Sequence, residues 1–266
     1  HHGALMDLGI KDKVALVFGG GSGLGKAIAT QLVEEGVKVV IAGRTDETLQ
    51  QTANTIRNHG NEALPIVWDL SDLSVIENNI ETIKQHFGSV DILINNTGGP
   101  PPTSAAGQAP EIWQEYFNSM VVSVIAITDQ ILPDMRAKGW WRIITSTSSG
   151  IISQIAGLEL SNALSMSLVG WSKTLAREIG KYGITANIVF PGRISTDRIV
   201  FHDTKRAERE GRTVESINEE SCTNIPLGGI GEPKEYGDDV TFLASERASY
   251  VTGSVIRVDG GLIPSV

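Results

Sequence analysis

A glycine-rich segment directly after an apolar run constrains the folds open to this chain more than any other feature. The run 14–18 is short and β-branched, and an amphipathic helical pattern, Gly25–Glu35, begins where the glycines end. Glycines let a backbone turn tightly and approach a bound diphosphate, while the free N–H groups and positive dipole end of the next helix attract it. A strand, a glycine loop and a helix in this order predict a dinucleotide-binding crossover. Its expected contact residues are Gly19, Gly21, Ser22, Gly23, Leu24 and Gly25.

Short apolar runs and longer amphipathic runs alternate along the whole chain. The strand-like runs are Val14–Phe18, Val37–Ala42, Ala63–Trp68, Asp91–Asn95, Trp141–Thr145, Thr185–Phe190 and Ser254–Val258. The helical patterns are Gly25–Glu35, Asp46–His59, Asp72–Phe87, Glu111–Lys138, Ala156–Lys181 and Pro233–Ser245. Most strand-like runs are apolar without alternation, which is typical of strands covered on both faces. We therefore predict an α/β, single-domain Rossmann fold, a doubly wound parallel seven-stranded sheet with helices on both faces.

Composition and charge exclude several classes of partner. The 266 residues carry a formal net charge of -9, whereas a surface that binds nucleic acid has to be basic. No uninterrupted apolar run is long enough to cross a bilayer, so we expect no membrane partner, and we expect no metal site. The single cysteine, Cys222, excludes an internal disulfide and suits a reducing compartment, so we expect a cytoplasmic protein. The segment 1–6 lacks a signal-peptide pattern and is interpreted as a tag remnant and the start of the chain.

One polar segment departs from the alternation. Residues 195–224 are rich in charge and stand between the sixth strand and the last helical pattern. A connection of this length exceeds an ordinary loop, so we interpret it as a lid over the site or as solvated surface helix, and both can hold together. The predicted organisation is therefore one domain, 7–266, with a lid-like insertion at about 195–224.

The end of the second strand indicates which dinucleotide is bound. A protein that binds NAD(H) usually places an acid at this strand end, where it holds the ribose hydroxyls of the adenosine. Here Gly43 stands at that point and Arg44 follows it. A guanidinium can hold a 2′-phosphate through two hydrogen bonds, and the Ser22 hydroxyl can add a contact. We therefore expect NADP(H) in preference to NAD(H), with a solvated loop cation as the alternative interpretation of Arg44.

Five motifs in this order resemble the short-chain dehydrogenase/reductase family over nearly the full length. They are Gly19-x3-Gly23-x-Gly25, Asp69-Leu70, Asn95-Asn96-Thr97-Gly98, Pro191-Gly192-Arg193-Ile194-Ser195-Thr196, and the tail from Tyr250-Val251-Thr252-Gly253 to Val258-Asp259-Gly260-Gly261. The resemblance implies a small-molecule carbonyl or alcohol substrate and a homo-oligomer, a tetramer or dimer packed through the helices Glu111–Lys138 and Ala156–Lys181. It also implies cofactor contacts at Asp69, Leu70, Asn96, Thr97, Gly98, Pro191, Gly192, Ile194 and Thr196.

The catalytic positions of that family are altered in this chain. The family uses a serine after the fifth strand and a Tyr-x-x-x-Lys motif on the next helix, where the phenol exchanges a proton with the substrate and the lysine lowers its pKa. Ser148 matches the family serine, whereas Ser161 and Ser165 stand where the tyrosine and the lysine belong. Met120 stands in place of the family's helix asparagine. None of the 4 tyrosines has a lysine four residues later, so the motif is absent rather than shifted.

Two functions are therefore open. The first is an NADP(H)-dependent oxidoreductase with Ser148 and Ser161 as catalytic candidates and a modified proton-transfer system. A serine hydroxyl is less acidic than a phenol, so another group is a candidate proton donor, and each candidate also has a simpler structural interpretation. These candidates are Glu159, Arg193 and His202. The second function is a non-catalytic NADP(H)-binding sensor or structural protein on the same fold.

Overall fold

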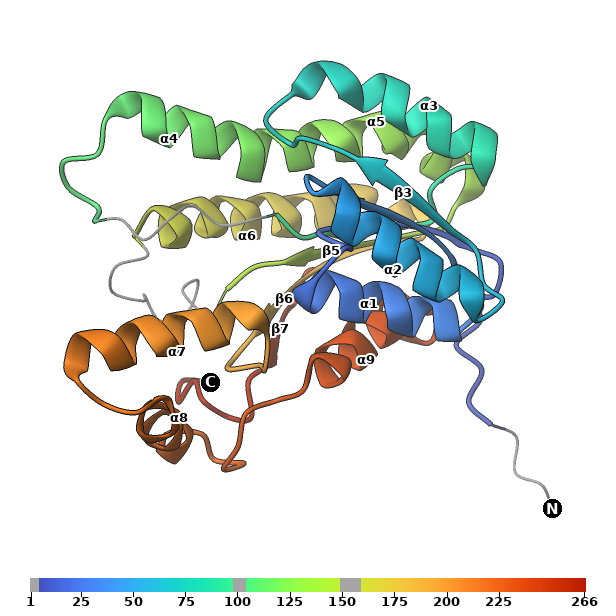
Figure 1. Ribbon diagram of the computed structural model, residues 1–266. Coiled ribbons are helices and arrows are strands. Elements are labelled where there is room, and N and C mark those ends of the chain that lie inside the picture. Colours follow the sequence, from blue (N-terminus) through green and yellow to red (C-terminus); the bar gives the residue numbers. More distant parts are fainter. Residues whose placement is uncertain (1–4, 98–103, 149–158) are drawn as a thin grey trace.

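A parallel sheet organises the computed structural model, which describes residues 5–97, 104–148 and 159–266 (Figure 1). Within these residues the sheet has seven strands in the order β3-β2-β1-β4-β5-β6-β7. The strands are β1 Val14–Phe18, β2 Lys38–Gly43, β3 Ala63–Val67, β4 Ile92–Asn95, β5 Trp141–Ser146, β6 Ile184–Pro191 and β7 Val255–Val258. The predicted doubly wound sheet is confirmed, and each strand differs from its predicted run by at most about one residue at either end.

The strand order reverses between β1 and β4. β1 pairs in parallel with β2 on one side and with β4 on the other, so the two halves of the sheet begin at neighbouring strands. In doubly wound sheets, ligands bind at the carboxyl ends of the strands beside such a switch point. The glycine loop after β1 and the segment after β4 leave the sheet at this place.

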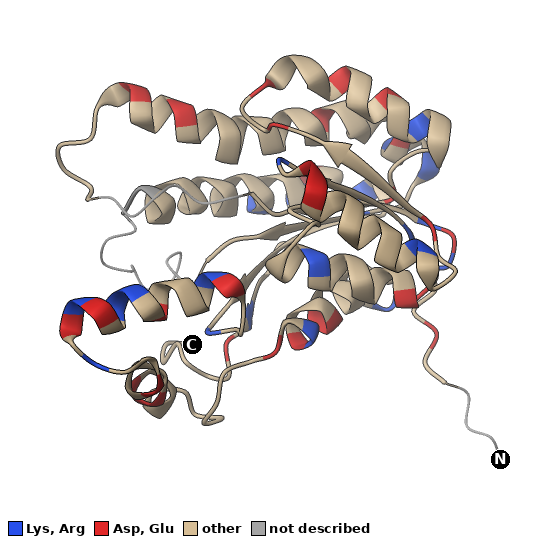
Figure 2. Ribbon diagram, viewed as in Figure 1, with Lys and Arg blue, Asp and Glu red and all other residues tan. Residues whose placement is uncertain are grey.

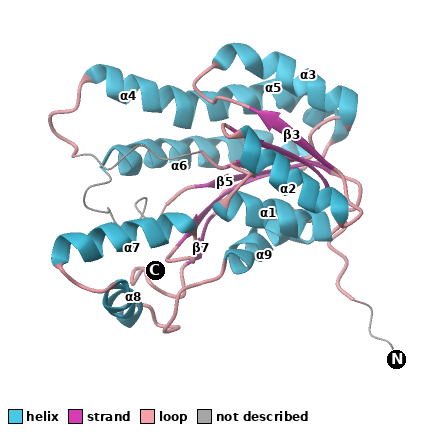
Figure 3. Cartoon of the chain, viewed as in Figure 1, coloured by secondary structure: helices cyan, strands magenta, loops and turns pink. Residues whose placement is uncertain are grey.

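Helices cover both faces of the sheet (Figure 3). The α-helices are α1 Gly23–Glu34, α2 Asp46–Asn58, α3 Ile76–His86, α4 Pro110–Phe117, α5 Ser123–Lys138, α6 Glu159–Ile179, α7 Asp197–Glu210, α8 Val214–Thr223 and α9 Pro233–Leu243. A π-helical turn, Asn118–Val122, joins α4 to α5. The pattern 111–138 therefore predicted one helical segment correctly, but not the wider turn within it.

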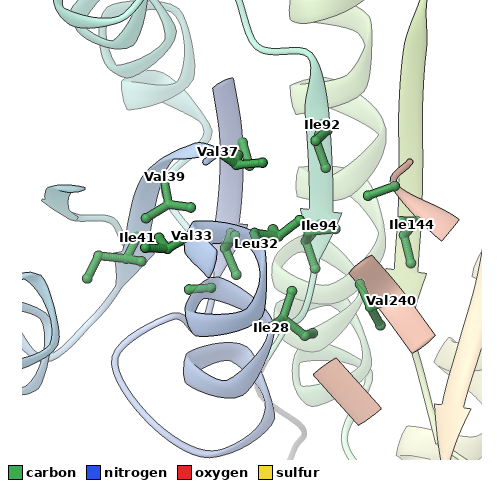
Figure 4. Packing of buried hydrophobic residues seen from close by; sticks show 14 of the residues in the cluster. Ile28, Leu32, Val33, Val37, Val39, Ile41, Ile92, Ile94, Ile144 and Val240 are labelled. Atoms are coloured by element: carbon green, nitrogen blue, oxygen red, sulfur yellow. The ribbon is translucent and has the colours of Figure 1, made fainter. Parts of the chain in front are cut away.

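One face of the sheet packs against α1, α2 and α9. Ile28 and Leu32 of α1 lie against Ile94 of β4, and Figure 4 shows these side chains meeting between the helix and the strands. Each such apolar side chain contributes about 1.5–3 kcal/mol when it is fully buried. Gly237 lets the two helices α1 and α9 approach closely. A Cβ built at this glycine would lie 2.8 Å from the carbonyl oxygen of Ala27.

The other face packs against α3, α5 and α6. Ile80, Ile131 and Leu175, one from each helix, belong to the cluster that covers it. At the carboxyl end of β1, the ring of Phe18 meets the ring of Trp68 edge-on, with centroids 4.9 Å apart. With both faces covered, the strands are buried throughout the centre of the sheet, which explains their continuous apolar sequence.

α1 begins two residues earlier than its pattern predicts. Gly23 and Leu24 join Gly25 in its first turn rather than lying in the preceding loop, and Gly25 is buried. Glycine has a low helix propensity and no apolar side chain, so an amphipathic pattern cannot show a turn that glycines build. The predicted phosphate loop is thus in part the N-terminal turn of a helix.

The polar segment 195–224 folds as two helices, α7 and α8. Gly211, with a φ of +64°, ends α7 in the left-handed conformation. In Figure 2 the ribbon of α7 is coloured for charged residues along much of its length, whereas most of the α6 ribbon is uncharged. The surface-helix interpretation agrees with this, whereas movement as a lid stays a prediction.

The described ranges lack a helix that is long and apolar enough to span a membrane. Within the same ranges, no three His, Cys, Asp or Glu side chains gather where they could hold a metal ion. Cys222 is a half-buried free thiol in α8.

Candidate functional site

A cavity of about 530 Å³ opens at the switch point of the sheet. Its walls come from the carboxyl ends of β1 and β2, from the segments after β3 and β4, and from α4. Eight of the predicted cofactor residues line it, namely Gly19, Gly21, Ser22, Arg44, Asp69, Leu70, Asn96 and Thr97. The fold thus gathers four separate sequence motifs around one hollow.

The glycine loop is packed so tightly that side chains would not fit. Gly19 has a φ of +66°, and a Cβ built on it would lie 2.7 Å from Nδ2 of Asn96. A Cβ on Gly25 would lie 2.1 Å from the carbonyl oxygen of Gly19. The loop therefore lies directly on the first turn of α1, whose positive dipole end faces the cavity where Ser22 borders it.

Ser22 is the N-cap residue of α1. Its backbone is extended, with φ −157°, and its side chain makes no cap hydrogen bond. The neighbouring Gly21 carbonyl accepts a hydrogen bond of 3.2 Å from the Thr52 hydroxyl, which ties the loop to α2. A rigid loop with an exposed, uncommitted hydroxyl at a helix N-terminus is well suited to hold an anion.

Arg44 and Asp69 place both signs of charge on one wall. Oδ1 of Asp69 accepts hydrogen bonds from the hydroxyl and the backbone N–H of Ser71, at 2.7 and 2.9 Å. These bonds, and to a lesser extent the charge of Arg44, hold the pKa of Asp69 below its ordinary value. The carboxylate is therefore ionised at neutral pH and can accept hydrogen bonds from a ligand beside the exposed guanidinium.

Three residues of the opposite wall were not predicted from the sequence. Glu115 and Tyr116 of α4, and Ser119 of the π-helical turn, also line the cavity. A π turn inserted into an α-helix changes which side chains face a given direction, and such turns are frequent at functional sites. The α-helical period alone could not indicate these residues.

A second cavity, of about 360 Å³, adjoins the start of α1. Gly23 and Thr196, two further predicted residues, line it together with the lysines Lys26 and Lys234. Thr196 is the N-cap of α7, and its hydroxyl accepts a hydrogen bond from the N–H of Ile199 at 3.5 Å. This cavity links the glycine loop to the segment that follows β6.

The remaining predicted cofactor residues support the walls rather than line these two cavities. In the described ranges they are Leu24, Gly25, Pro191, Gly192 and Ile194. The Gly192 N–H donates to the carbonyl oxygen of Val258 at 2.8 Å, and a Cβ on Gly192 would lie 2.6 Å from Cα of Asp259. The segment after β6 is thereby fixed against the end of β7. Gly98 lies outside the described residues.

The hydroxyl of Ser148 stands at the carboxyl end of β5. Its oxygen is buried and has no hydrogen-bond partner among the described residues, and the same holds for the hydroxyl of Thr147. Leaving a buried hydroxyl unpaired costs free energy, so such groups in native proteins call for an explanation, of which a bound ligand is one.

Ser161 and Ser165 lie in the first turns of α6. Ser161 is half-buried and Ser165 is buried, so neither resembles an exposed surface serine. The nearest lysine along α6, Lys173, donates to the carbonyl oxygen of Gly253 at 3.1 Å. That bond commits the ammonium group of Lys173 to the segment before β7, so this group is not free to act as the lysine that the family resemblance implies. The catalytic roles of Ser148 and Ser161 stay predictions.

Two of the other proton-donor candidates have structural partners. The Arg193 guanidinium pairs with the carboxylate of Asp203 in α7, and both side chains are mostly buried. Nε2 of His202 lies 3.4 Å from Nε of Arg198, one turn away on α7. The side chain of Glu159 lies outside the described residues. The guanidinium of Arg193 is therefore engaged with α7.

Comparison of the sequence with known families and proteins gives matches over nearly the whole chain. Residues 19–263 match the family model described as enoyl-(acyl carrier protein) reductase. The 3-oxoacyl-[acyl-carrier-protein] reductase FabG of Vibrio cholerae is 31% identical over 255 residues, covering 96% of this chain and 99% of the relative. FabG of Salmonella typhimurium is 32% identical over 256 residues, with coverage of 96% and 99%.

Solved structures give the same result. L-sorbose reductase from Gluconobacter frateurii, complexed with NADPH and L-sorbose, superposes with a TM-score of 0.93 at 30% identity, covering 98% of this chain and 100% of that one. A single-residue variant of actinorhodin polyketide ketoreductase, with NADPH, superposes with a TM-score of 0.88 at 30% identity, covering 94% and 97%. Both similar proteins were solved with the reduced phosphorylated nucleotide.

Proposed function

The chain belongs to the short-chain dehydrogenase/reductase family, and we propose that it is an NADP(H)-dependent oxidoreductase acting on a carbonyl or alcohol substrate. The observation that carries this proposal is the cavity in which the glycine loop, Arg44, Asp69 and Asn96 meet at the switch point. The similar reductases, two of them solved with NADPH, support the same cofactor.

The residues around the cavity fit an extended dinucleotide phosphate. A Cβ on Gly21 would lie 2.8 Å from Oγ1 of Thr48, so only glycine lets the loop pack this closely against α2 beside the cavity. The N-terminus of α1 would hold the diphosphate, and Arg44 the 2′-phosphate. Asp69, ionised and already oriented by Ser71, would accept a hydrogen bond from the adenine amino group.

When bound, NADPH supplies a hydride to an electrophilic carbon of the substrate. The chain's own residues would hold and polarise the substrate at the carboxyl end of β5. The Ser148 hydroxyl, buried without a hydrogen-bond partner among the described residues, would donate a hydrogen bond to the substrate oxygen, and this bond would strengthen as negative charge develops there.

The proton for that oxygen would come through a modified system. By the sequence resemblance Ser161 takes the position of the family's phenol, but a serine is too weak an acid to give up its proton outright at neutral pH. We infer that Ser161 passes on a proton from solvent, or only orients the substrate. Slow turnover on ordinary ketones is the expected consequence.

The second candidate is a protein that binds NADP(H) without turnover. The observation that favours it is the absence, anywhere in the sequence, of a tyrosine with a lysine four residues later. Such a protein would use the same cavity as a sensor or as a structural element.

A binding and turnover assay separates the two. NADPH and NADH are titrated by fluorescence, and oxidation of the bound nucleotide is then followed with diketones, quinones and oxoacyl esters. The enzyme hypothesis predicts turnover on at least one substrate class. Micromolar NADPH binding with no turnover on any substrate supports the sensor, and no binding of either nucleotide contradicts both.

A double substitution tests the reactive end directly. Ser161→Tyr with Ser165→Lys is expected to raise the rate on simple ketones by about tenfold or more, because a positioned general acid contributes about 10²–10⁴-fold in well-aligned sites. Ser165 is 4% exposed, so thermal unfolding has to confirm that the variant folds. No gain in a folded variant means that the substrate cleft differs as well.

Assembly and location are further parts of the proposal. We propose a homo-oligomer, a dimer or tetramer, packed through the α4–α5 segment and α6. Exposed apolar side chains on these helices, Phe117 and Met166, support this face. A cytoplasmic location stays a prediction from the single cysteine.

A further inference from the structure

A tyrosine outside every motif reaches the carboxyl end of β5 from α9. Tyr236 is fully buried, and its hydroxyl oxygen lies 2.6 Å from that of Ser146. Ser146 is the last residue of β5 and stands two residues before Ser148. The preceding residues of β5 are buried, whereas Ser146 is half-buried. A buried phenol is therefore bonded to a half-buried hydroxyl at the carboxyl end of β5.

The donor in this pair can be assigned from chemistry. The Tyr236 hydroxyl also lies 3.4 Å from the carbonyl oxygen of Val189, but it has one hydrogen to give. That carbonyl already accepts the N–H of Thr147 at 2.9 Å. A phenol is a better donor than a serine hydroxyl, so its hydrogen belongs in the shorter bond, to Ser146. The hydrogen of Ser146 is then free to point away from Tyr236.

The phenol stays neutral in this environment. Burial raises the pKa of Tyr236, and the nearby carboxylate of Asp239 acts in the same direction, while the bond to Ser146 opposes them. Tyr236 is consequently no proton donor for catalysis, since loss of its proton would leave a buried phenolate. Its hydrogen bond can only orient its partner.

The position of Ser146 indicates what it faces. Side chains alternate along a strand, so Ser146 shares a face of the sheet with Ile144, which packs in the same cluster as Tyr236 and α1. The helix α1, which follows the glycine loop, packs on this same face of the sheet. In a doubly wound sheet the nicotinamide half of the cofactor extends across the carboxyl ends of the strands. Ser146 would then contact the cofactor, and Ser148, two residues later, would contact the substrate.

We propose that Tyr236 is a positioning residue that turns the hydrogen of Ser146 toward the carboxamide oxygen of the nicotinamide. The inference rests on the proposed function, because it requires a bound nicotinamide nucleotide. It assigns Ser146 as a cofactor contact and Tyr236 as the residue that fixes the direction of that contact. Together they would set the orientation of the nicotinamide ring.

The test is a double-mutant cycle read by binding rather than by activity. Ser146→Ala, Tyr236→Phe and the double variant are titrated with NADPH and with 2′,5′-ADP, which carries the adenosine phosphates but no nicotinamide. Each single variant is expected to weaken NADPH binding by about 3- to 10-fold, as for the loss of one hydrogen bond. The double variant should be no weaker than either single one, because both remove the same contact. Binding of 2′,5′-ADP should not change.

Two controls separate positioning from structure. Ser146→Thr keeps the hydroxyl and should retain NADPH affinity while Tyr236 is present. Tyr182→Phe removes another tyrosine hydroxyl, one bonded to Arg136 away from the cavity, and should leave both affinities unchanged. Thermal unfolding of every variant shows whether an affinity change follows from loss of the fold.

Several outcomes overturn the inference. Unchanged NADPH affinity in both single variants overturns it. This includes the case in which only substrate turnover falls, because the Ser146 hydroxyl then faces the substrate. Additive losses, or equal weakening of 2′,5′-ADP, indicate a general structural role. If the wild type binds NADPH but turns over no substrate, the proposed enzyme function fails, and the binding cycle still tests the roles of Ser146 and Tyr236. If the wild type binds no NADPH, the proposed function and this inference both fail.

Discussion

Arg44 is the residue expected to contribute most to the distinction between NADPH and NADH. It is exposed on the cavity wall beside Asp69, so its guanidinium is available to a ligand phosphate. Arg44→Ala should weaken NADPH binding by about 10- to 100-fold, since hydrogen bonds to a charged group contribute about 1.5–3 kcal/mol, and should leave NADH binding nearly unchanged. Isothermal titration of both nucleotides checks this.

Arg136→Ala is the matched control for Arg44. Arg136 lies over the ring of Tyr182, 4.3 Å from its centroid, and is not among the cavity residues. Its loss should change neither affinity. Equal weakening of NADPH and NADH by Arg44→Ala would mean that Arg44 contacts a part common to both nucleotides.

Asp69 should show an acid-side effect on stability. Ser71 is the main cause of its lowered pKa. Because the pKa is lower in the folded state than in the unfolded one, its contribution to the free energy of unfolding is present above the unfolded pKa of about 4, and is lost as the pH falls through the folded value. Ser71→Ala should move the pKa of Asp69 back toward its ordinary value.

Carbon-13 NMR of the Asp69 carboxyl measures that shift directly. The pH dependence of unfolding should flatten slightly below about pH 4 in the variant, since less of the stability is then linked to Asp69. Ser74→Ala is a matched control, because its hydroxyl makes the equivalent bond to Asp72 at 2.6 Å. An Asp69 pKa that does not move in Ser71→Ala contradicts the assignment.

At the scale of elements, the start of α1 depends on direct contact between the backbone at Gly25 and the backbone at Gly19. Gly25→Ala would force a Cβ against the Gly19 carbonyl and should abolish nucleotide binding by displacing the loop. Gly170, in α6, has open space where its Cβ would be. Gly170→Ala should raise the free energy of unfolding by about 0.5–1 kcal/mol through helix propensity. Urea unfolding and NADPH titration of both variants check the contrast, and equal effects would refute it.

A mostly buried ion pair, Arg193 with Asp203, ties α7 to the segment that follows β6. Asp203→Asn leaves the Arg193 guanidinium without its countercharge, and removing one partner of a buried pair costs about 3–5 kcal/mol when burial is complete. Hydrogen exchange should therefore accelerate in 195–224 and little elsewhere. Glu208→Gln, in the exposed pair with Lys205 at 3.8 Å, is the control and should have almost no effect. Uniform exchange across the chain would show that α7 does not open separately.

The elements also show where sequence reasoning succeeds and where it stops. Buried parallel strands are continuous apolar runs, so β1 to β7 could be predicted to within about one residue. The π turn at Asn118–Val122 and the first turn of α1 could not, because neither changes the hydrophobic period in a readable way. Ser146 and Tyr236 were missed for a different reason: their contact joins β5 to α9, across 90 positions of sequence.

At the scale of the whole molecule, the sequence motifs were enough to predict which residues come together around the cofactor half of the site. Gly19, Arg44, Asp69 and Asn96 follow strands β1, β2, β3 and β4 in turn, and parallel strands bring their carboxyl ends to one edge. The substrate half was harder to predict, because it combines the end of β5 with helices whose relative positions depend on packing. Tyr116 of α4 lines the same cavity as the cofactor residues, and no motif indicates it.

Assembly is the property of the whole molecule that the exposed surface predicts. Phe117 and Met166, 42% and 45% exposed, lie on α4 and α6, two helices whose other apolar side chains share one cluster. Burial of this face between subunits would favour association, so light scattering should give a multiple of 28.5 kDa. Phe117→Glu with Met166→Glu should lower the mass, because two carboxylates per subunit would have to be desolvated in the interface. Val67→Glu, 55% exposed on β3 at the sheet's far edge, should not. A concentration of about 50 μM is well above that at which interfaces of standard size associate. A wild-type monomer at this concentration would therefore contradict the proposed assembly.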